Sequence, residues 1–128
     1  MNYYFSRRIQ SDFESGLDRV RKALATEGFG ILSEIDVSAT LKKRLGVDFR
    51  RYTILGACNP PFAHKALELE DKIGTMLPCN VVVQELAPGS LEVAAVDPVA
   101  SMQAVRNPGL AEIADEVRAK LQRAVKDV

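Results

Sequence analysis

Two stretches of the chain repeat their apolar residues at helical spacing. In the first, Ser11 and Glu14 have the spacing of a capping box, and Glu27-Gly28 supplies a stop. Its apolar stripe consists of Phe13, Leu17, Val20 and Leu24. The second stripe consists of Leu110, Ile113, Ala114, Val117, Leu121 and Val125. Both stripes predict an amphipathic helix with one buried face.

Five other stretches have the composition of β-strands. They are residues 3–9, 29–37, 52–58, 79–86 and 91–96. A turn signal, Pro88-Gly89, lies between the last two stretches. It predicts that these two strands form a hairpin.

The stretch 29–37 alternates apolar with polar residues. The apolar positions that share one face of the predicted strand are Phe29, Ile31, Ile35 and Val37. Only Leu32, on the polar face, breaks the alternation. We therefore expect a strand with one buried face.

Shorter helices are predicted between the strands. Ser38 can cap a short helix that Gly46 ends. Asn59 is a capping residue followed by Pro60 at the first helical position, where the missing N–H of proline costs nothing. The helix that they begin is expected to end near Gly74.

This order of elements predicts a single α+β domain over residues 1–128. We expect a two-layer sandwich, in which two long helices cover one face of a curved, mainly antiparallel, five-stranded sheet. The other face of the sheet must then be polar, or covered by a partner.

Charge and composition narrow the possible functions. Seventeen basic and seventeen acidic residues cancel, which gives no support to nucleic-acid or membrane-surface binding. The charges are unevenly distributed: residues 1–51 carry ten basic and seven acidic groups, whereas 52–97 carry two basic and six acidic. No run of apolar residues is long enough to span a membrane, and the N-terminal residues lack the apolar run of a signal peptide. We therefore expect a cytoplasmic protein with two reduced cysteines.

Four segments of the sequence resemble one known family. They are GFGILSEIDV, YTILGACNPPFAHKAL, GTMLPCNVVVQE and VDPVASM, and their most specific parts are ILGACNP, LPCNVVV and VDP. In this order and spacing they resemble family 302 of the domains of unknown function, from about Tyr3 to Val125. The resemblance implies a fold similar to that of TATA-binding protein, and a homodimer. It does not imply DNA binding, because function depends on sites rather than folds.

Two Cys-Asn pairs form the candidate site. Cys58-Asn59 closes one predicted strand and Cys79-Asn80 opens the next. If these strands are antiparallel neighbours, both pairs lie at the same edge of the sheet, beside the helix that connects them. His64, the only histidine, lies on that helix.

These residues allow several kinds of chemistry. Asn59, Asn80 and the helix N-terminus suit a small anionic or amide-bearing ligand. Cys58 and Cys79 suit thiol-redox chemistry, with the Cys58 thiolate favoured by the helix dipole. With His64 they suit zinc or copper, although their spacing matches no known metal site. Alternatively, all of them are structural: buried cysteines, a helix cap and a strand-end asparagine.

The main hypothesis is a homodimeric module that binds a small ligand at Cys58, Asn59, Cys79, Asn80 and His64. The alternatives are a thiol-redox or metal-linked protein that uses Cys58 and Cys79, and a structural or protein-interaction domain. No residue is identified as catalytic, because the sequence contains no Ser-His-Asp set, phosphate loop or dinucleotide fingerprint. No motif identifies a cofactor.

Overall fold

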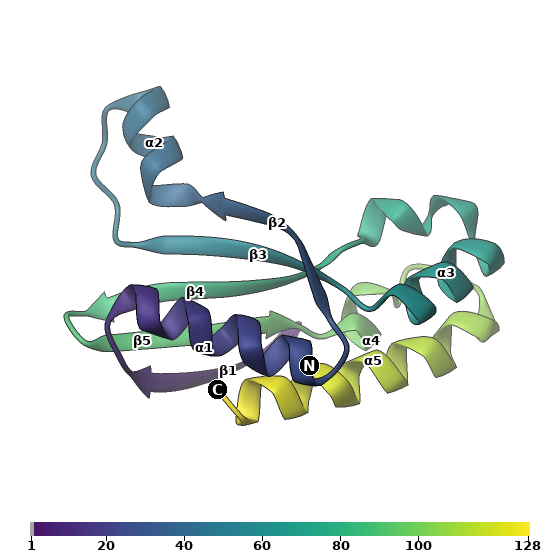
Figure 1. The fold of residues 1–128 in the computed structure, drawn as a ribbon. Coiled ribbons are helices and arrows are strands. Elements are labelled where there is room, and N and C mark those ends of the chain that lie inside the picture. The colour runs from purple at the N-terminus through teal and green to yellow at the C-terminus, as the bar shows by residue number, and fades with distance from the viewer. Residues whose placement is uncertain (1) are drawn as a thin grey trace.

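The computed structural model describes residues 2–128, which form five strands with helices between and after them (Figure 1). In chain order the elements are β1 (Tyr4–Gln10), α1 (Phe13–Thr26), β2 (Gly30–Asp36), α2 (Val37–Leu45), β3 (Tyr52–Cys58), α3 (Pro60–Leu69), the 3₁₀ helix η1 (Asp71–Met76), β4 (Cys79–Ala87), β5 (Ser90–Val96), α4 (Pro98–Ser101) and α5 (Pro108–Lys126). No helix within residues 2–128 is long and apolar enough to cross a membrane.

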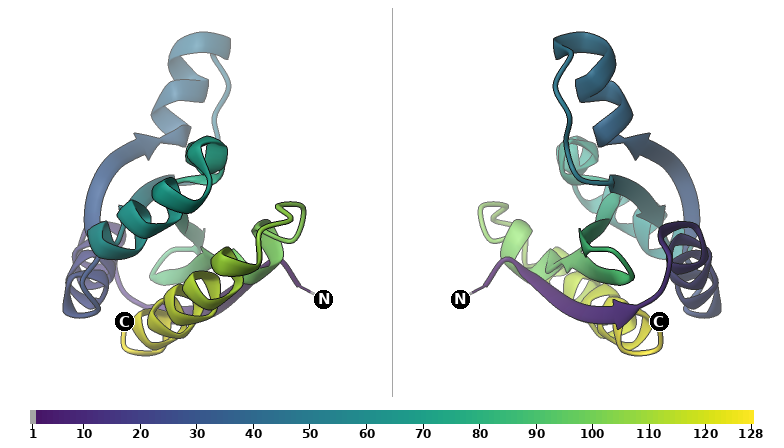
Figure 2. Two further views of the ribbon diagram at one scale, coloured as in Figure 1. Left: turned by 90° about the vertical axis from the view of Figure 1, so that its right-hand side faces the viewer. Right: turned by 90° about the vertical axis from the view of Figure 1, so that its left-hand side faces the viewer.

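The strands form one antiparallel sheet in the order β1-β5-β4-β3-β2. Both views of Figure 2 show the sheet curving from β1 to β2, with α1 and α5 on one side of it. The predicted α+β architecture, with two long helices on one sheet face, is therefore confirmed.

The core lies between the sheet and these two helices. Its strand residues alternate along β3, β4 and β5, as the pleat requires. Those with no measurable exposure are Leu55, Ala57, Val81, Val83, Leu91, Val93 and Ala95. The apolar stripes of α1 and α5 cover them, with Leu24 and Leu121 fully buried.

The opposite face of the sheet, called the open face below, has no helix packed on it in Figure 2. A row of apolar side chains crosses it, and the strand register assigns to this row Ala94, Val82, Ile54 and Ile35. The neighbouring row is polar and consists of Arg8, Glu92, Gln84 and Tyr52. The open face is thus apolar along its middle and polar beside it.

A β-bulge in β2 changes the predicted faces of that strand. The register shifts between Ile31 and Ser33, so Leu32 is the extra residue. Ile31 pairs with buried Ala57 on the helix side, whereas Ile35 pairs with Ile54 on the open face. The prediction that Ile31 and Ile35 share one buried face was therefore wrong. The break at Leu32 in the sequence pattern was the signal of this bulge.

Two helix caps also differ from the prediction. Asp12, rather than Ser11, caps α1, because its carboxylate accepts a hydrogen bond from the backbone N–H of Ser15 at 2.9 Å. Asp36, rather than Ser38, caps α2 and accepts from the N–H of Ala39. The actual cap lies one position after the predicted one in α1 and two positions before it in α2, and in both helices its carboxylate reaches a free backbone N–H.

The helix predicted to run from Pro60 to Gly74 is interrupted. α3 ends at Leu69, and a 3₁₀ helix follows from Asp71. The side chain of Asn107 donates a hydrogen bond to the backbone carbonyl of Leu69 at 2.9 Å. This contact, from a residue distant in sequence, satisfies a carbonyl that the last turn of the helix leaves free.

The fold predicts a large difference between two leucine-to-alanine substitutions. Leu55→Ala removes a fully buried side chain and should lower the free energy of unfolding by about 2–5 kcal/mol. Leu32→Ala, at a position that is 68% exposed, should change it by less than about 0.5 kcal/mol. Urea denaturation of both variants measures this difference, and equal losses would contradict the assigned faces.

Candidate functional site

The two Cys-Asn pairs lie at the same end of neighbouring strands. β3 and β4 are antiparallel, with Ala57 opposite Cys79 and Gly56 opposite Asn80. The end of β3 therefore meets the start of β4 beside the N-terminus of α3 (Figure 1). This is the arrangement that the sequence predicted for antiparallel strands.

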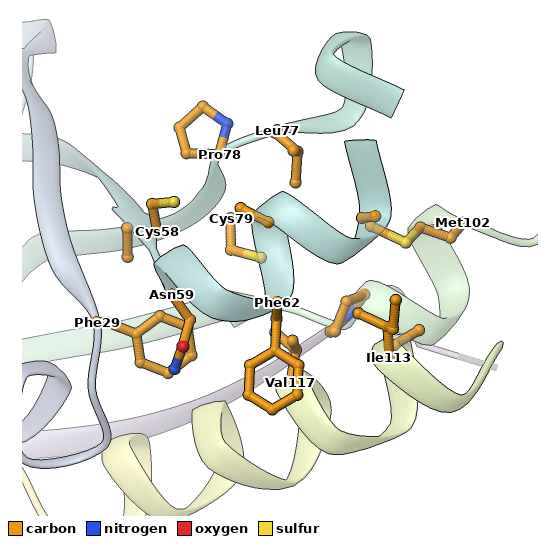
Figure 3. A pocket seen from close by; sticks show the side chains of 15 residues that line it. Phe29, Cys58, Asn59, Phe62, Leu77, Pro78, Cys79, Met102, Ile113 and Val117 are labelled. Atoms are coloured by element: carbon orange, nitrogen blue, oxygen red, sulfur yellow. The ribbon is translucent and has the colours of Figure 1, made fainter. Parts of the chain in front are cut away.

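The side chains of the two pairs nevertheless diverge. Cys79 is buried on the helix side, whereas Asn80, the next residue, is exposed on the open face. Cys58 is half-buried, and both cysteines are free thiols. Figure 3 shows the sulfur of Cys79 pointing away from Cys58. Because successive side chains of a strand point to opposite faces, Cys79 and Asn80 lie on different sides of the sheet, although the sequence predicted one site that contains both.

Asn59 has a structural contact in place of the predicted cap. It occupies the N-cap position of α3 but makes no side-chain capping hydrogen bond. Its Nδ2 instead donates to the backbone carbonyl of Glu27 at 3.1 Å, and the residue is only 8% exposed. Asn59 therefore fastens the β3–α3 junction to the turn after α1.

His64 lies apart from the cysteines. Its side chain is 78% exposed, and its Nε2 lies 3.2 Å from Oε1 of Glu68, one turn further along α3. No group of three His, Cys, Asp or Glu residues within residues 2–128 is arranged to hold a metal ion. The proposed Cys58–His64–Cys79 ligand set is therefore not assembled in this structure.

A small cavity lies beneath α3, next to the cysteines (Figure 3). It has a volume of about 30 Å³, and its walls are almost entirely apolar. The lining includes Cys58, Asn59, Phe62, Cys79 and Val117. Because a single water already needs about 10–15 Å³ of such space, this cavity is far too small for an organic ligand.

Burial makes Cys79 unreactive. Desolvation, with a smaller contribution from the nearby Cys58, raises the pKa of the Cys79 thiol from its ordinary value of 9.0 to about 11. Only the thiolate is nucleophilic, so the protonated thiol is inert near neutral pH. Cys79 behaves as a small apolar side chain that fills space beneath α3.

A larger hollow lies on the open face. Its volume is about 390 Å³. The apolar side chains of its floor are Val82, Ala94 and Val96, and its rim consists of Tyr3, Tyr4, Tyr52, Asn80, Gln84 and Glu92. Of the predicted site residues, only Asn80 belongs to this hollow. Sequence reasoning missed the others, although alternation along 79–86 did indicate that Asn80 and Gln84 share a face.

A chain of hydrogen bonds fixes one side of the hollow. Nε of Arg50 donates to Oε1 of Gln84 at 2.8 Å, and Nε2 of Gln84 donates to Oε1 of Glu92 at 3.2 Å. The guanidinium of Arg50 also lies 4.4 Å from the centre of the Phe49 ring. These contacts orient the Gln84 amide, which leaves the second carboxylate oxygen of Glu92 available as an acceptor.

Substitution of Asn59 and of Asn80 by alanine tests whether each side chain contributes to stability. Asn59→Ala leaves the Glu27 carbonyl without its donor and should lower the free energy of unfolding by about 1–3 kcal/mol. Asn80→Ala, at an exposed position, should change it by less than about 0.5 kcal/mol. Urea denaturation of the pair tests this, and a larger loss for Asn80→Ala would reverse the assignment.

Alkylation tests the burial of Cys79. In the Cys58→Ser protein at pH 8, iodoacetamide should modify native Cys79 at least about tenfold more slowly than in the urea-unfolded chain, because desolvation, the main cause of the raised pKa, is retained and suppresses the thiolate. Mass spectrometry measures the rate. A native rate close to the unfolded rate would disprove the burial.

The same thiol predicts a pH dependence of stability. Between pH 9 and pH 11 the folded chain retains a proton that the unfolded chain loses, so the free energy of unfolding should fall as pH rises through this window. Below pH 9 the contribution is fully present. The Cys79→Ala variant, which lacks the thiol, is the control and should have a shallower slope.

Comparison with known proteins agrees with the fold and the sequence motifs. The family model described as "Domain of unknown function DUF302" matches residues 5–128. A solved structure, the uncharacterized conserved protein DUF302 from Bacillus stearothermophilus, matches with a TM-score of 0.90 and 26% identity, covering 99% of this chain and 98% of that chain. No curated protein matches the chain. The chain belongs to the DUF302 family.

Proposed function

We propose that this domain binds a small ligand in the hollow of the open face. The supporting observation is the hollow itself, with its volume of about 390 Å³, apolar floor and polar rim. Small-molecule sites are typically concave, about 300–1,000 Å³ in volume and mostly apolar, with a few polar groups that fix orientation. The cavity at the cysteines, at about 30 Å³, is far below this range.

The rim indicates the chemistry of the ligand. Glu92 is the one charged residue that lines the hollow within residues 2–128, and the amides of Asn80 and Gln84 add further polar groups. Carboxylate and amide oxygens accept hydrogen bonds. A ligand with a flat apolar body over Val82 and one or more N–H or O–H donors facing Glu92 fits this lining.

The other functions considered for the Cys-Asn pairs have less support. Thiol chemistry needs an accessible thiolate, whereas Cys79 is buried with a raised pKa. Metal binding needs ligands that converge, whereas His64 points toward Glu68. A cytoplasmic location is part of the proposal, supported by two unbridged cysteines.

Filling the hollow tests the proposal. Val82→Trp puts a large side chain on its floor, on a strand position that tolerates aromatic residues. Fluorinated aromatic amines and alcohols, screened by ¹⁹F NMR, should bind the wild-type domain with dissociation constants of about 1 mM or tighter. The Val82→Trp variant should bind the same compounds at least about tenfold more weakly, since the floor they contact is occupied.

Leu32→Trp is the matched control, because it adds the same side chain at an exposed position outside the hollow. It should keep the wild-type affinity. Bound compounds should shift the backbone amide signals of Asn80, Gln84 and Glu92. Shifts confined to Cys58, Asn59 and Phe62 would instead assign binding to the cavity beneath α3 and disprove the proposal.

A further inference from the structure

The apolar row of the open face has polar side chains on both sides of it. On β4, Asn80 lies two residues before Val82, and Gln84 lies two residues after it. All three side chains point to the open face, because alternate residues of a strand share a face. All three also line the hollow. A molecule that lies along β4 in the hollow therefore meets a polar, an apolar and a second polar side chain in turn.

One end of the hollow is built around Asn80 and Tyr4. Tyr4 lies opposite Val96, and the register that pairs Val81 with Ala95 places Asn80 beside Val96. The side chain of Asn80 is exposed and has no hydrogen bond to any residue in 2–128. Its amide can therefore donate a hydrogen bond to a ligand or accept one from it.

The other end of the hollow accepts hydrogen bonds. Nε of Arg50 donates to the amide oxygen of Gln84, and Nε2 of Gln84 donates to Oε1 of Glu92. The amide oxygen of Gln84 is thus already bonded, which leaves the second carboxylate oxygen of Glu92 as the acceptor for a ligand. This end of the hollow selects an N–H or O–H donor, whereas the Asn80 end takes a donor or an acceptor.

Positive charge near Glu92 favours an uncharged donor over a cation. Arg8 lies directly opposite Glu92 on β1, and Arg50 reaches the same polar row through Gln84. Both guanidinium groups remain charged at any ordinary pH. A ligand ammonium group beside Glu92 would be repelled by two like charges, whereas a neutral N–H or O–H group would not.

The sizes of the side chains give the hollow its shape. Val82 and Ala94, between the two ends, are small. Tyr4 on β1 and Tyr52 on β3 are large and line the hollow from strands that β5 and β4 separate. The ring of Tyr3 lies edge-on to that of Tyr4, with the ring centres 5.0 Å apart. Short side chains between tall ones leave room for a flat apolar body.

We propose that the ligand of the hollow is an elongated molecule with a polar group at each end and a flat apolar body between them. An uncharged donor at one end bonds to Glu92, and an amide or carbonyl group at the other end bonds to Asn80. The polar positions Asn80 and Gln84 are four residues apart on β4, which is about 13 Å. The body is therefore longer than a single aromatic ring.

This inference rests on the proposed function and adds three properties to it. They are the length of the ligand, the absence of charge at its donor and the hydrogen bond at its far end. Asn80 becomes a specificity-determining residue, because it distinguishes ligands that share the same donor and the same apolar body.

Four compounds, each with one ring fluorine for ¹⁹F NMR, test the proposal. The first is a biphenyl with an amino group at one end and a carboxamide at the other. It should bind about three- to tenfold more tightly than aminobiphenyl, which lacks the carboxamide, because one further hydrogen bond is worth a factor of this size. It should exceed para-aminobenzamide, which is too short to reach both ends, by a similar factor. Its aminomethyl analogue, a cation at neutral pH, should bind no more tightly than the amine.

Substitutions at the two ends should have different effects. Asn80→Ala should weaken binding of the biphenyl carboxamide about three- to tenfold and change that of aminobiphenyl by less than about twofold. Glu92→Gln should weaken binding of both compounds, because both place their amino group there. Gln10→Ala is the matched control for Asn80→Ala, since it removes an amide from an exposed position of β1 outside the hollow. It should leave both dissociation constants unchanged.

The outcomes separate this inference from the proposed function. Equal binding of the three uncharged compounds would overturn the elongated form, as would an Asn80→Ala variant that binds the biphenyl carboxamide normally; in both cases binding in the hollow would stand. An aminomethyl analogue that binds about tenfold more tightly than the amine would overturn the uncharged donor. If no compound binds, or if Val82→Trp affects none of them, the proposed function fails and this inference fails with it.

Discussion

The antiparallel pairing of β3 with β4 is the constraint on which both faces of this domain depend. Leu55 lies opposite Val81, and this row of fully buried side chains packs beneath α1 and α5. The alternate row, with Ile54 opposite Val82, then faces away from the helices. A slip of one residue would exchange the two rows and expose the core. The burial that fixes the register therefore also fixes the floor of the hollow.

The most distinctive sequence motifs are explained by packing at one end of these two strands. A Cβ atom on Gly56 would lie 2.3 Å from Oγ of Ser33 and 2.8 Å from Cγ of Pro78, so only glycine fits between β2 and the start of β4. Asn59 fastens the junction to the Glu27 carbonyl, and Cys79 fills the space beneath α3. The motifs ILGACNP and LPCNVVV thus describe a close-packed corner, which accounts for them without a reaction.

The open face and the charged ends of the fold lie outside the core, so core packing does not determine which residues occupy them. The open face combines an apolar row with a hydrogen-bonded polar row that Arg50, Gln84 and Glu92 hold in place. Residues 37–51 carry five basic groups and one acidic group, whereas residues 60–76 and 108–117, at the other end of the fold, carry six acidic and two basic groups.

The sequence by itself determined the helices, the strands and the class of fold, because helical and strand periodicities are local properties. It also indicated that both Cys-Asn pairs meet at one sheet edge, since consecutive antiparallel strands require it. Only the tertiary structure decided which side of the sheet each side chain occupies. A single bulged residue, Leu32, moves Ile35 to the open face, and the pleat sends Cys79 and Asn80 in opposite directions. The hollow joins residues of β1, β3, β4 and β5, so it depends on a strand order that no local pattern contains.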